Sequence, residues 1–81
     1  MKISNAIKKL EKNGFKVSKD GIQHTGAKLG LSYIIEFYQN GREDSIACIK
    51  VRHPADLDDS MTDYSAGTFC DNITQAIRLA S

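Results

Sequence analysis

The sequence contains little cysteine and no long apolar run, and both shortages narrow the class of protein. Its two cysteines, Cys48 and Cys70, are too few for a disulfide framework, so we expect free thiols. No apolar run approaches the roughly 20 residues that a membrane-spanning helix needs. The first residues also lack the apolar core of a signal peptide. We therefore predict a cytoplasmic protein without a membrane partner.

The chain is also short, and its 81 residues predict one domain over residues 1–81. A domain of this size buries only about 60% of the surface of its unfolded chain, so it has little core to spare for a deep active site. We therefore predict no cofactor and no enzymatic activity. Because burial is scarce, the sequence also leaves a homodimer open.

The net charge of +1 hides an uneven distribution of charge along the chain. Residues 1–30 contain seven lysines and two acids, which is a net charge of +5. Residues 31–81 contain four basic residues and eight acids, which is a net charge of −4. Such an asymmetry can orient a charged partner, although two halves of a sequence need not become two halves of a surface.

Hydrophobic periodicity predicts a helix near each end of the chain. The first covers residues 4–13, with Ser4 as its N-cap and Gly14 in the left-handed position after its last turn. Residues 68–71 have the pattern of a capping box that opens the second helix. The apolar face of this second helix comprises Phe69, Ile73, Ala76, Ile77 and Ala80.

The first of two predicted hairpins joins residues 15–19 to residues 22–25 through a two-residue turn at Asp20-Gly21. This turn pairs Lys19 with Ile22 and places His24 opposite Val17 as a half-buried residue of the sheet.

The second hairpin joins residues 31–39 to residues 45–53, with a turn that opens at Asn40-Gly41. A connection with an odd number of residues keeps the apolar sets on one face, because a slip of one residue turns every side chain over. The core sets are then Tyr33, Ile35 and Phe37 beside Ala47, Ile49 and Val51. The outer face then carries Glu36, Tyr38, Lys50 and Arg52.

Together these elements predict an α+β fold of the order αββββα. Two hairpins form a four-stranded antiparallel sheet, and the N-terminal and C-terminal helices pack on one face of it.

The acidic stretch after Pro54, residues 54–67, is the strongest functional feature of the sequence, because long loops without periodicity often carry function. Acids alternate there with apolar residues, a pattern that suits docking on a basic, partly apolar protein surface. The predicted contacts are Asp56, Asp58, Asp59, Met61, Asp63 and Tyr64. The alternative is a crossover that packs Leu57, Met61 and Tyr64 on the core. A calcium loop is not predicted, because the required glycine at position 6 is Met61.

Nucleic-acid binding is the alternative function, because lysines cluster in the first helix and two more cations lie on the outer sheet face. The candidate contacts are Lys8, Lys9, Lys12, Lys50 and Arg52. Residues 33–43, in their helix–sheet–helix setting, resemble part of a double-stranded-RNA-binding domain. That resemblance implies a lysine cluster at the start of the second helix, where this chain has residues 68–71, with no lysine among them.

Metal and catalytic sites find little support in the spacing of cysteine and histidine. Cys48, Cys70, His24 and His53 form no C-x-x-C or H-x-x-x-H pair, so no metal is predicted. A Cys70–His53 nucleophile pair is conceivable, but Asp71 beside the thiol opposes a thiolate.

In its organisation the chain resembles the small accessory proteins of phages and plasmids, among them anti-CRISPR-type inhibitors. The shared traits are size, a single α+β domain, an acidic loop and the lack of a catalytic set. The resemblance implies a protein that blocks a host defence or nucleic-acid-handling protein. The sequence therefore favours a small non-enzymatic protein-binding module, with nucleic-acid binding as the alternative.

Overall fold

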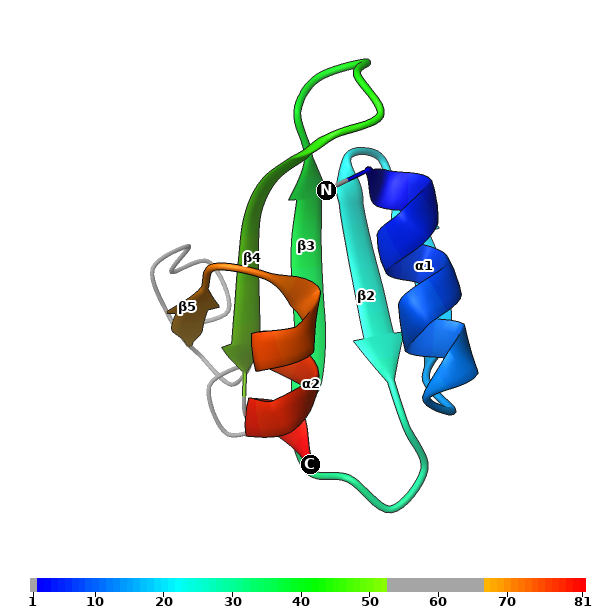
Figure 1. Cartoon of the computed structure of the whole chain (residues 1–81), viewed down its shortest axis with the longest axis vertical. Helices are drawn as coiled ribbons and strands as arrows, with labels where there is room; N and C mark the ends of the chain where they lie inside the picture. The colour runs from blue at the N-terminus through cyan, green and yellow to red at the C-terminus, as the bar shows by residue number, and fades with distance from the viewer. Residues whose placement is uncertain (1, 53–66) are drawn as a thin grey trace.

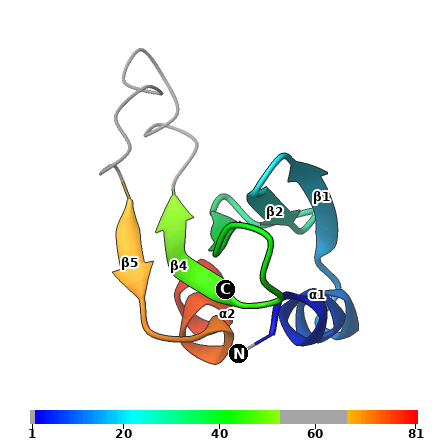
Figure 2. The same ribbon diagram turned by 90° about the horizontal axis from the view of Figure 1, so that it is seen from above.

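A computed structural model describes residues 2–52 and 67–81 of the chain. Within these residues, five strands form one antiparallel sheet in the order β1-β2-β3-β4-β5, and two helices lie on the same face of it (Figures 1 and 2). The fold is therefore α+β, as predicted, with a helix near each end. The elements are α1 (Ile3–Lys12), β1 (Lys16–Asp20), β2 (Gln23–Ala27), β3 (Ile34–Gln39), β4 (Ile46–Arg52), β5 (Thr68–Cys70) and α2 (Ile73–Ala80).

The fifth strand corrects the predicted order αββββα. Thr68, Phe69 and Cys70 pair with β4 instead of opening a helix, which suits β-branched and aromatic residues. The cap of α2 follows at Asn72, whose side chain accepts a hydrogen bond from the Gln75 N–H at 2.8 Å. An Asn-x-x-Gln sequence therefore caps the helix, four residues after the position that the sequence suggested.

The start of α1 is also different from the prediction, because Ser4 lies inside the helix and Lys2 is the N-cap. Lys2 makes no side-chain capping bond. Instead, the carboxylate of Asp44 accepts hydrogen bonds from the Ser4 N–H at 3.2 Å and from its hydroxyl at 3.1 Å. At the other end, Gly14 has a φ of +87°, as predicted for the residue after the last turn.

In the first hairpin, the first strand ends one residue later and the second strand begins one residue later than predicted. Asp20 pairs with Gln23 and Lys19 with His24, so the two turn residues are Gly21 and Ile22. Gly21 has a φ of +64°, and glycine at the first central position suits a two-residue hairpin turn as well as Asp-Gly does. His24 therefore lies opposite Lys19 instead of Val17.

The second hairpin confirms the predicted facing of its apolar residues. Ile35 pairs with Val51 and Phe37 with Ile49, on the face that the helices cover. A register shift follows between Tyr38 and Gln39, which makes Ala47 the extra residue of a bulge and leaves it exposed. Ala47 was predicted to join the core, and so was Tyr33, which is 41% exposed, so those parts of the prediction are wrong.

The core lies between the helices and the sheet. Both helices contribute every third or fourth residue, in agreement with the predicted periodicity. At Gly26 a Cβ atom would lie 3.2 Å from the Leu10 Cδ1, so α1 packs closely over β2. The buried apolar residues are Ile3, Ala6, Leu10, Phe15, Ile35, Phe37, Ile49, Val51, Ile73, Ala76 and Ala80.

Candidate functional site

The outer face of the sheet contains a buried polar network across β2, β3 and β4. Glu36 accepts a hydrogen bond from the Gln23 amide at 2.8 Å and forms an ion pair with the Arg52 guanidinium at 3.0 Å. The ammonium of Lys50 lies 5.5 Å from the ring centre of Tyr38 and 5.8 Å from that of Phe69. Burial and the nearby Glu36 raise the pKa of the Tyr38 hydroxyl above its usual value.

This burial bears on the predicted nucleic-acid contacts. Lys50 is 0% exposed and Arg52 is 5% exposed, so the two cations of the outer face are enclosed in the fold. On α1, in contrast, Lys8 and Lys12 are exposed and Lys9 is half-buried. The structure therefore separates the five predicted residues into three on the helix, of which Lys8 and Lys12 are exposed, and an enclosed pair in the sheet.

The predicted protein-binding residues Asp56, Asp58, Asp59, Met61, Asp63 and Tyr64 lie outside the described residues, as does His53. The described residues that flank this stretch are Arg52, at the end of β4, and Gly67, before β5. Both belong to the end of the sheet that is remote from β1.

The lysine-rich part of the sequence stays together in space. α1 packs against β1, and β1 and β2 are neighbours at one end of the sheet, so the lysine-rich residues 2–28 occupy one end of the molecule (Figures 1 and 2). The described residues after residue 30, which form the rest of the molecule, contain four basic and four acidic side chains. We call the end formed by α1, β1 and β2 the basic end.

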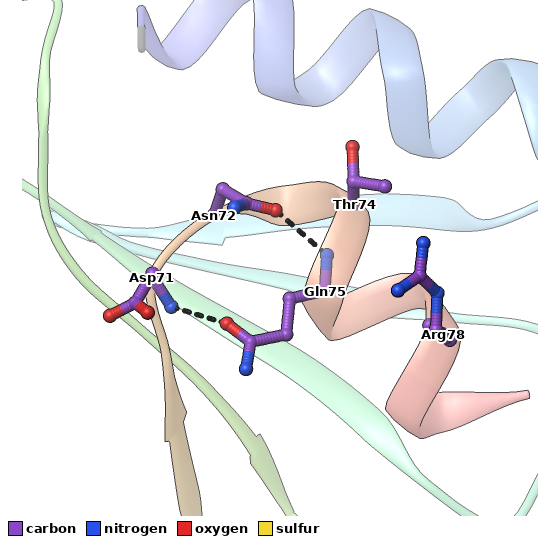
Figure 3. Close-up of a pocket in the computed structure, with 5 residues that line it drawn as sticks. All are labelled: Asp71, Asn72, Thr74, Gln75 and Arg78. Carbon is purple, nitrogen blue, oxygen red and sulfur yellow. Dashed lines mark hydrogen bonds between the residues drawn. The ribbon is translucent and has the colours of Figure 1, made fainter.

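The two helices come together along their solvent side, where α2 borders an open hollow of about 500 Å³. The ammonium of Lys9 on α1 donates a hydrogen bond to the Thr74 hydroxyl on α2. Arg78 follows Thr74 by one helical turn, and both side chains point toward α1 (Figure 3). The residues that line the hollow are Asp71, Asn72, Thr74, Gln75 and Arg78.

Thr74 and Arg78 were absent from the predicted site. The phase of the second helix was correct at Ile73, Ala76 and Ala80, and it places Thr74 and Arg78 together on an uncovered side. The missing information was that this side borders α1, because periodicity within one helix does not identify its neighbour.

The thiols lie in a different environment from the basic end. Burial raises the pKa of the Cys70 thiol above its usual value, and the neighbouring Asp71 raises it further. Its Sγ–H faces the Thr68 carbonyl oxygen at 3.7 Å. A raised thiol pKa opposes the thiolate that nucleophilic catalysis would need. Among residues 2–52 and 67–81, no three histidine, cysteine or acidic side chains gather in a group that suits a metal ion.

Neither described helix has the length and apolar composition that crossing a bilayer requires. Comparisons with protein-family models, with curated proteins and with solved structures found no significant match for this chain.

Proposed function

We propose that the protein is a non-enzymatic binding module of the cytoplasm and that its basic end binds nucleic acid. One observation supports this function above all: the fold gathers the lysine-rich α1, β1 and β2 at one end of the molecule. Lys8 and Lys12, four residues apart on α1, are both exposed and available to phosphate groups.

Lysines bind nucleic acid chiefly by neutralising phosphates and releasing the counterions condensed on them. Each such contact changes the slope of log affinity against log salt concentration by about −0.9 for duplex DNA. The basic end offers several exposed lysines, and contacts with phosphates carry no base information, so we expect binding that depends strongly on salt and weakly on base sequence.

The test is a fluorescence-anisotropy titration of the full chain with a labelled DNA duplex and with its single strand, between about 50 and 200 mM salt. The double substitution Lys8→Gln, Lys12→Gln should weaken binding and reduce the salt slope by about 2. The matched control is Arg42→Gln, an exposed cation in the connection between β3 and β4. Equal affinities for the control and the double variant would contradict the proposal.

A protein partner is the second candidate function, with the acidic stretch as the contact. In its support, the flanking residues Arg52 and Gly67 lie at the end of the sheet opposite to the basic end, and Phe69 nearby is 50% exposed. Acids beside exposed apolar area suit a basic protein surface. In this form the protein would act as a phage-type inhibitor of a nucleic-acid-handling protein.

The two candidates are separated by a pull-down with the tagged chain from its native host, with and without nuclease. A stoichiometric partner that survives nuclease and is lost with Asp58→Lys, Asp59→Lys would support the protein-binding function. If that partner is retained by the charge-reversed variant, the acidic stretch is not the contact. Recovery of nucleic acid alone, lost at moderate salt, would favour the basic end.

A further inference from the structure

The side of α2 that borders α1 carries two hydrogen-bond donors, and a third comes from α1, at the other end of the chain. Lys9 comes from α1, and Thr74 and Arg78 come from α2. The Lys9 ammonium donates a hydrogen bond to the Thr74 hydroxyl, and this contact links the two helices. Arg78 is exposed, and its guanidinium points toward α1 across the hollow (Figure 3).

Of the acids that the structure describes, Asp71 and Glu11 do not point at these donors. Asp71 lines the hollow, but its carboxylate points away from Thr74 and Arg78 (Figure 3). Glu11 follows Lys9 by two residues, about 200° around α1, so it lies on the opposite flank of that helix. The flank of α1 that carries Lys9 and faces α2 is therefore cationic.

The cap of α2 is also accounted for, so the donors of the site are side chains rather than the helix terminus. The Gln75 N–H donates to Asn72 Oδ1 at 2.8 Å, and the Asp71 N–H donates to Gln75 Oε1 at 2.8 Å (Figure 3). The donors left between the helices are the Arg78 guanidinium and the Thr74 hydroxyl of α2 and the Lys9 ammonium of α1. Arginine and lysine have no acceptor, and a planar guanidinium matches the oxygen pair of a phosphate.

We propose that Lys9, Thr74 and Arg78 form a phosphate-binding site between the helices and that it holds a backbone phosphate of bound nucleic acid. The site rests on the proposed function and makes it more specific. It extends the contact from the exposed lysines of α1 onto α2. The nucleic-acid strand would run over the contact between the two helices. Lys8 and Lys12 would then bind the phosphates on either side of the phosphate that Arg78 holds. A guanidinium makes this central contact directional, whereas the flanking lysines act as point charges.

The test uses the same anisotropy titration with Arg78→Ala, Arg78→Lys and the control Arg42→Ala. Arg78→Ala should weaken binding about tenfold and reduce the salt slope by about 1. Arg78→Lys should recover the slope but only part of the affinity, because it keeps the charge and loses the fork. Thermal melts of each variant show whether the fold is kept, and Arg78 is exposed enough that we expect little change.

The outcomes separate the site from the proposed function. If the lysine variant of α1 loses binding while Arg78→Ala matches Arg42→Ala, nucleic-acid binding stands and the site between the helices is wrong. If the unaltered chain binds neither duplex nor single strand, the proposed function is wrong and the phosphate that the site would bind does not belong to nucleic acid. A titration with inorganic phosphate followed by amide NMR shifts then decides the site itself. Shifts confined to α2 around Thr74 and Arg78 would keep a phosphate site, and their absence would overturn it.

Discussion

His24 is the residue with the least favourable surroundings in the described core. It is 3% exposed, and its ring stacks on that of Phe37 with centroids 5.0 Å apart and 11° between the planes. Within the described residues neither ring nitrogen has a hydrogen-bond partner. A buried polar group without a partner costs about 1–3 kcal/mol of stability. The stacked ring therefore contributes packing while its nitrogens oppose folding.

We predict that His24→Phe stabilises the protein by about 1 kcal/mol, because it keeps the aromatic stack and removes the two unpaired nitrogens. For a domain of this size the melting temperature should rise by about 4–8 °C. Urea denaturation and thermal melting measure both quantities. The control is Ile22→Phe in the exposed hairpin turn, which should change stability by less than about 0.5 kcal/mol. Destabilisation by His24→Phe alone would show that the imidazole makes a favourable polar contact.

At the scale of the elements, a connection of two residues joins β5 to α2, and the side chain of Asn72 caps the start of the helix. Cys70 still pairs with Ile49, and two residues later Asn72 caps the helix. The sequence has three residues of N-cap type in this region, Thr68, Asp71 and Asn72, and the last of them caps the helix. Thr68 belongs to the strand, since β4 offers backbone partners for residues 68–70.

Substitutions at Thr68 and Asn72 should therefore differ. Asn72→Ala should destabilise the protein by about 1 kcal/mol, because the Gln75 N–H loses its acceptor. Thr68→Ala, at an exposed strand position, should cost less than about 0.5 kcal/mol. Urea denaturation followed by far-ultraviolet circular dichroism measures both. A larger loss from Thr68→Ala than from Asn72→Ala would show that the helix begins earlier.

At the scale of the whole molecule, each strand pairs with its neighbours in sequence, so distant segments are joined mainly through the helices. Among residues 2–52 and 67–81, polar contacts link a helix to a distant segment at two places. Lys9 joins α1 to Thr74 of α2, and Asp44 joins the connection between β3 and β4 to the start of α1. The hydrogen bonds from Ser4 lower the pKa of the Asp44 carboxyl below its usual value.

The lowered pKa predicts an acid-dependent loss of stability. A carboxyl with a lower pKa in the folded state stabilises the protein above its unfolded pKa of about 4 and loses this contribution as the pH falls through the folded value. Asp44→Asn should therefore lower the melting temperature at neutral pH, and its curve should converge with that of the unaltered chain in acid. Melting curves between about pH 2 and 7 measure this. Asp20→Asn, at the exposed end of β1, is the control for the change in charge. A gap that persists unchanged in acid would contradict the capping role of Asp44.

The sequence predicted most of what depends on neighbouring residues. Alternation along residues 34–38 and 48–51 was sufficient to place Ile35, Phe37, Ile49 and Val51 on one face, because a slip of one residue would have turned charged side chains into the core. The pairing of Phe37 with Ile49 was decided by the structure, since a slip of two residues keeps the same faces. The buried faces of both helices followed from their periodicity, because apolar residues three or four positions apart lie on one side of a helix. The lysine-rich first half was visible as composition alone.

Only the tertiary structure decided the features that depend on which segments meet. The burial of Glu36, Lys50 and Arg52 on the outer face could not be predicted, because alternation assigns a face but does not show how far that face is covered. Residues 68–70 became a strand because β4 has a free side there. Lys9 contacts Thr74 because both helices pack on the same face of the sheet. The sequence by itself therefore determined the pattern of the elements, and packing between distant elements determined the surface that they form together.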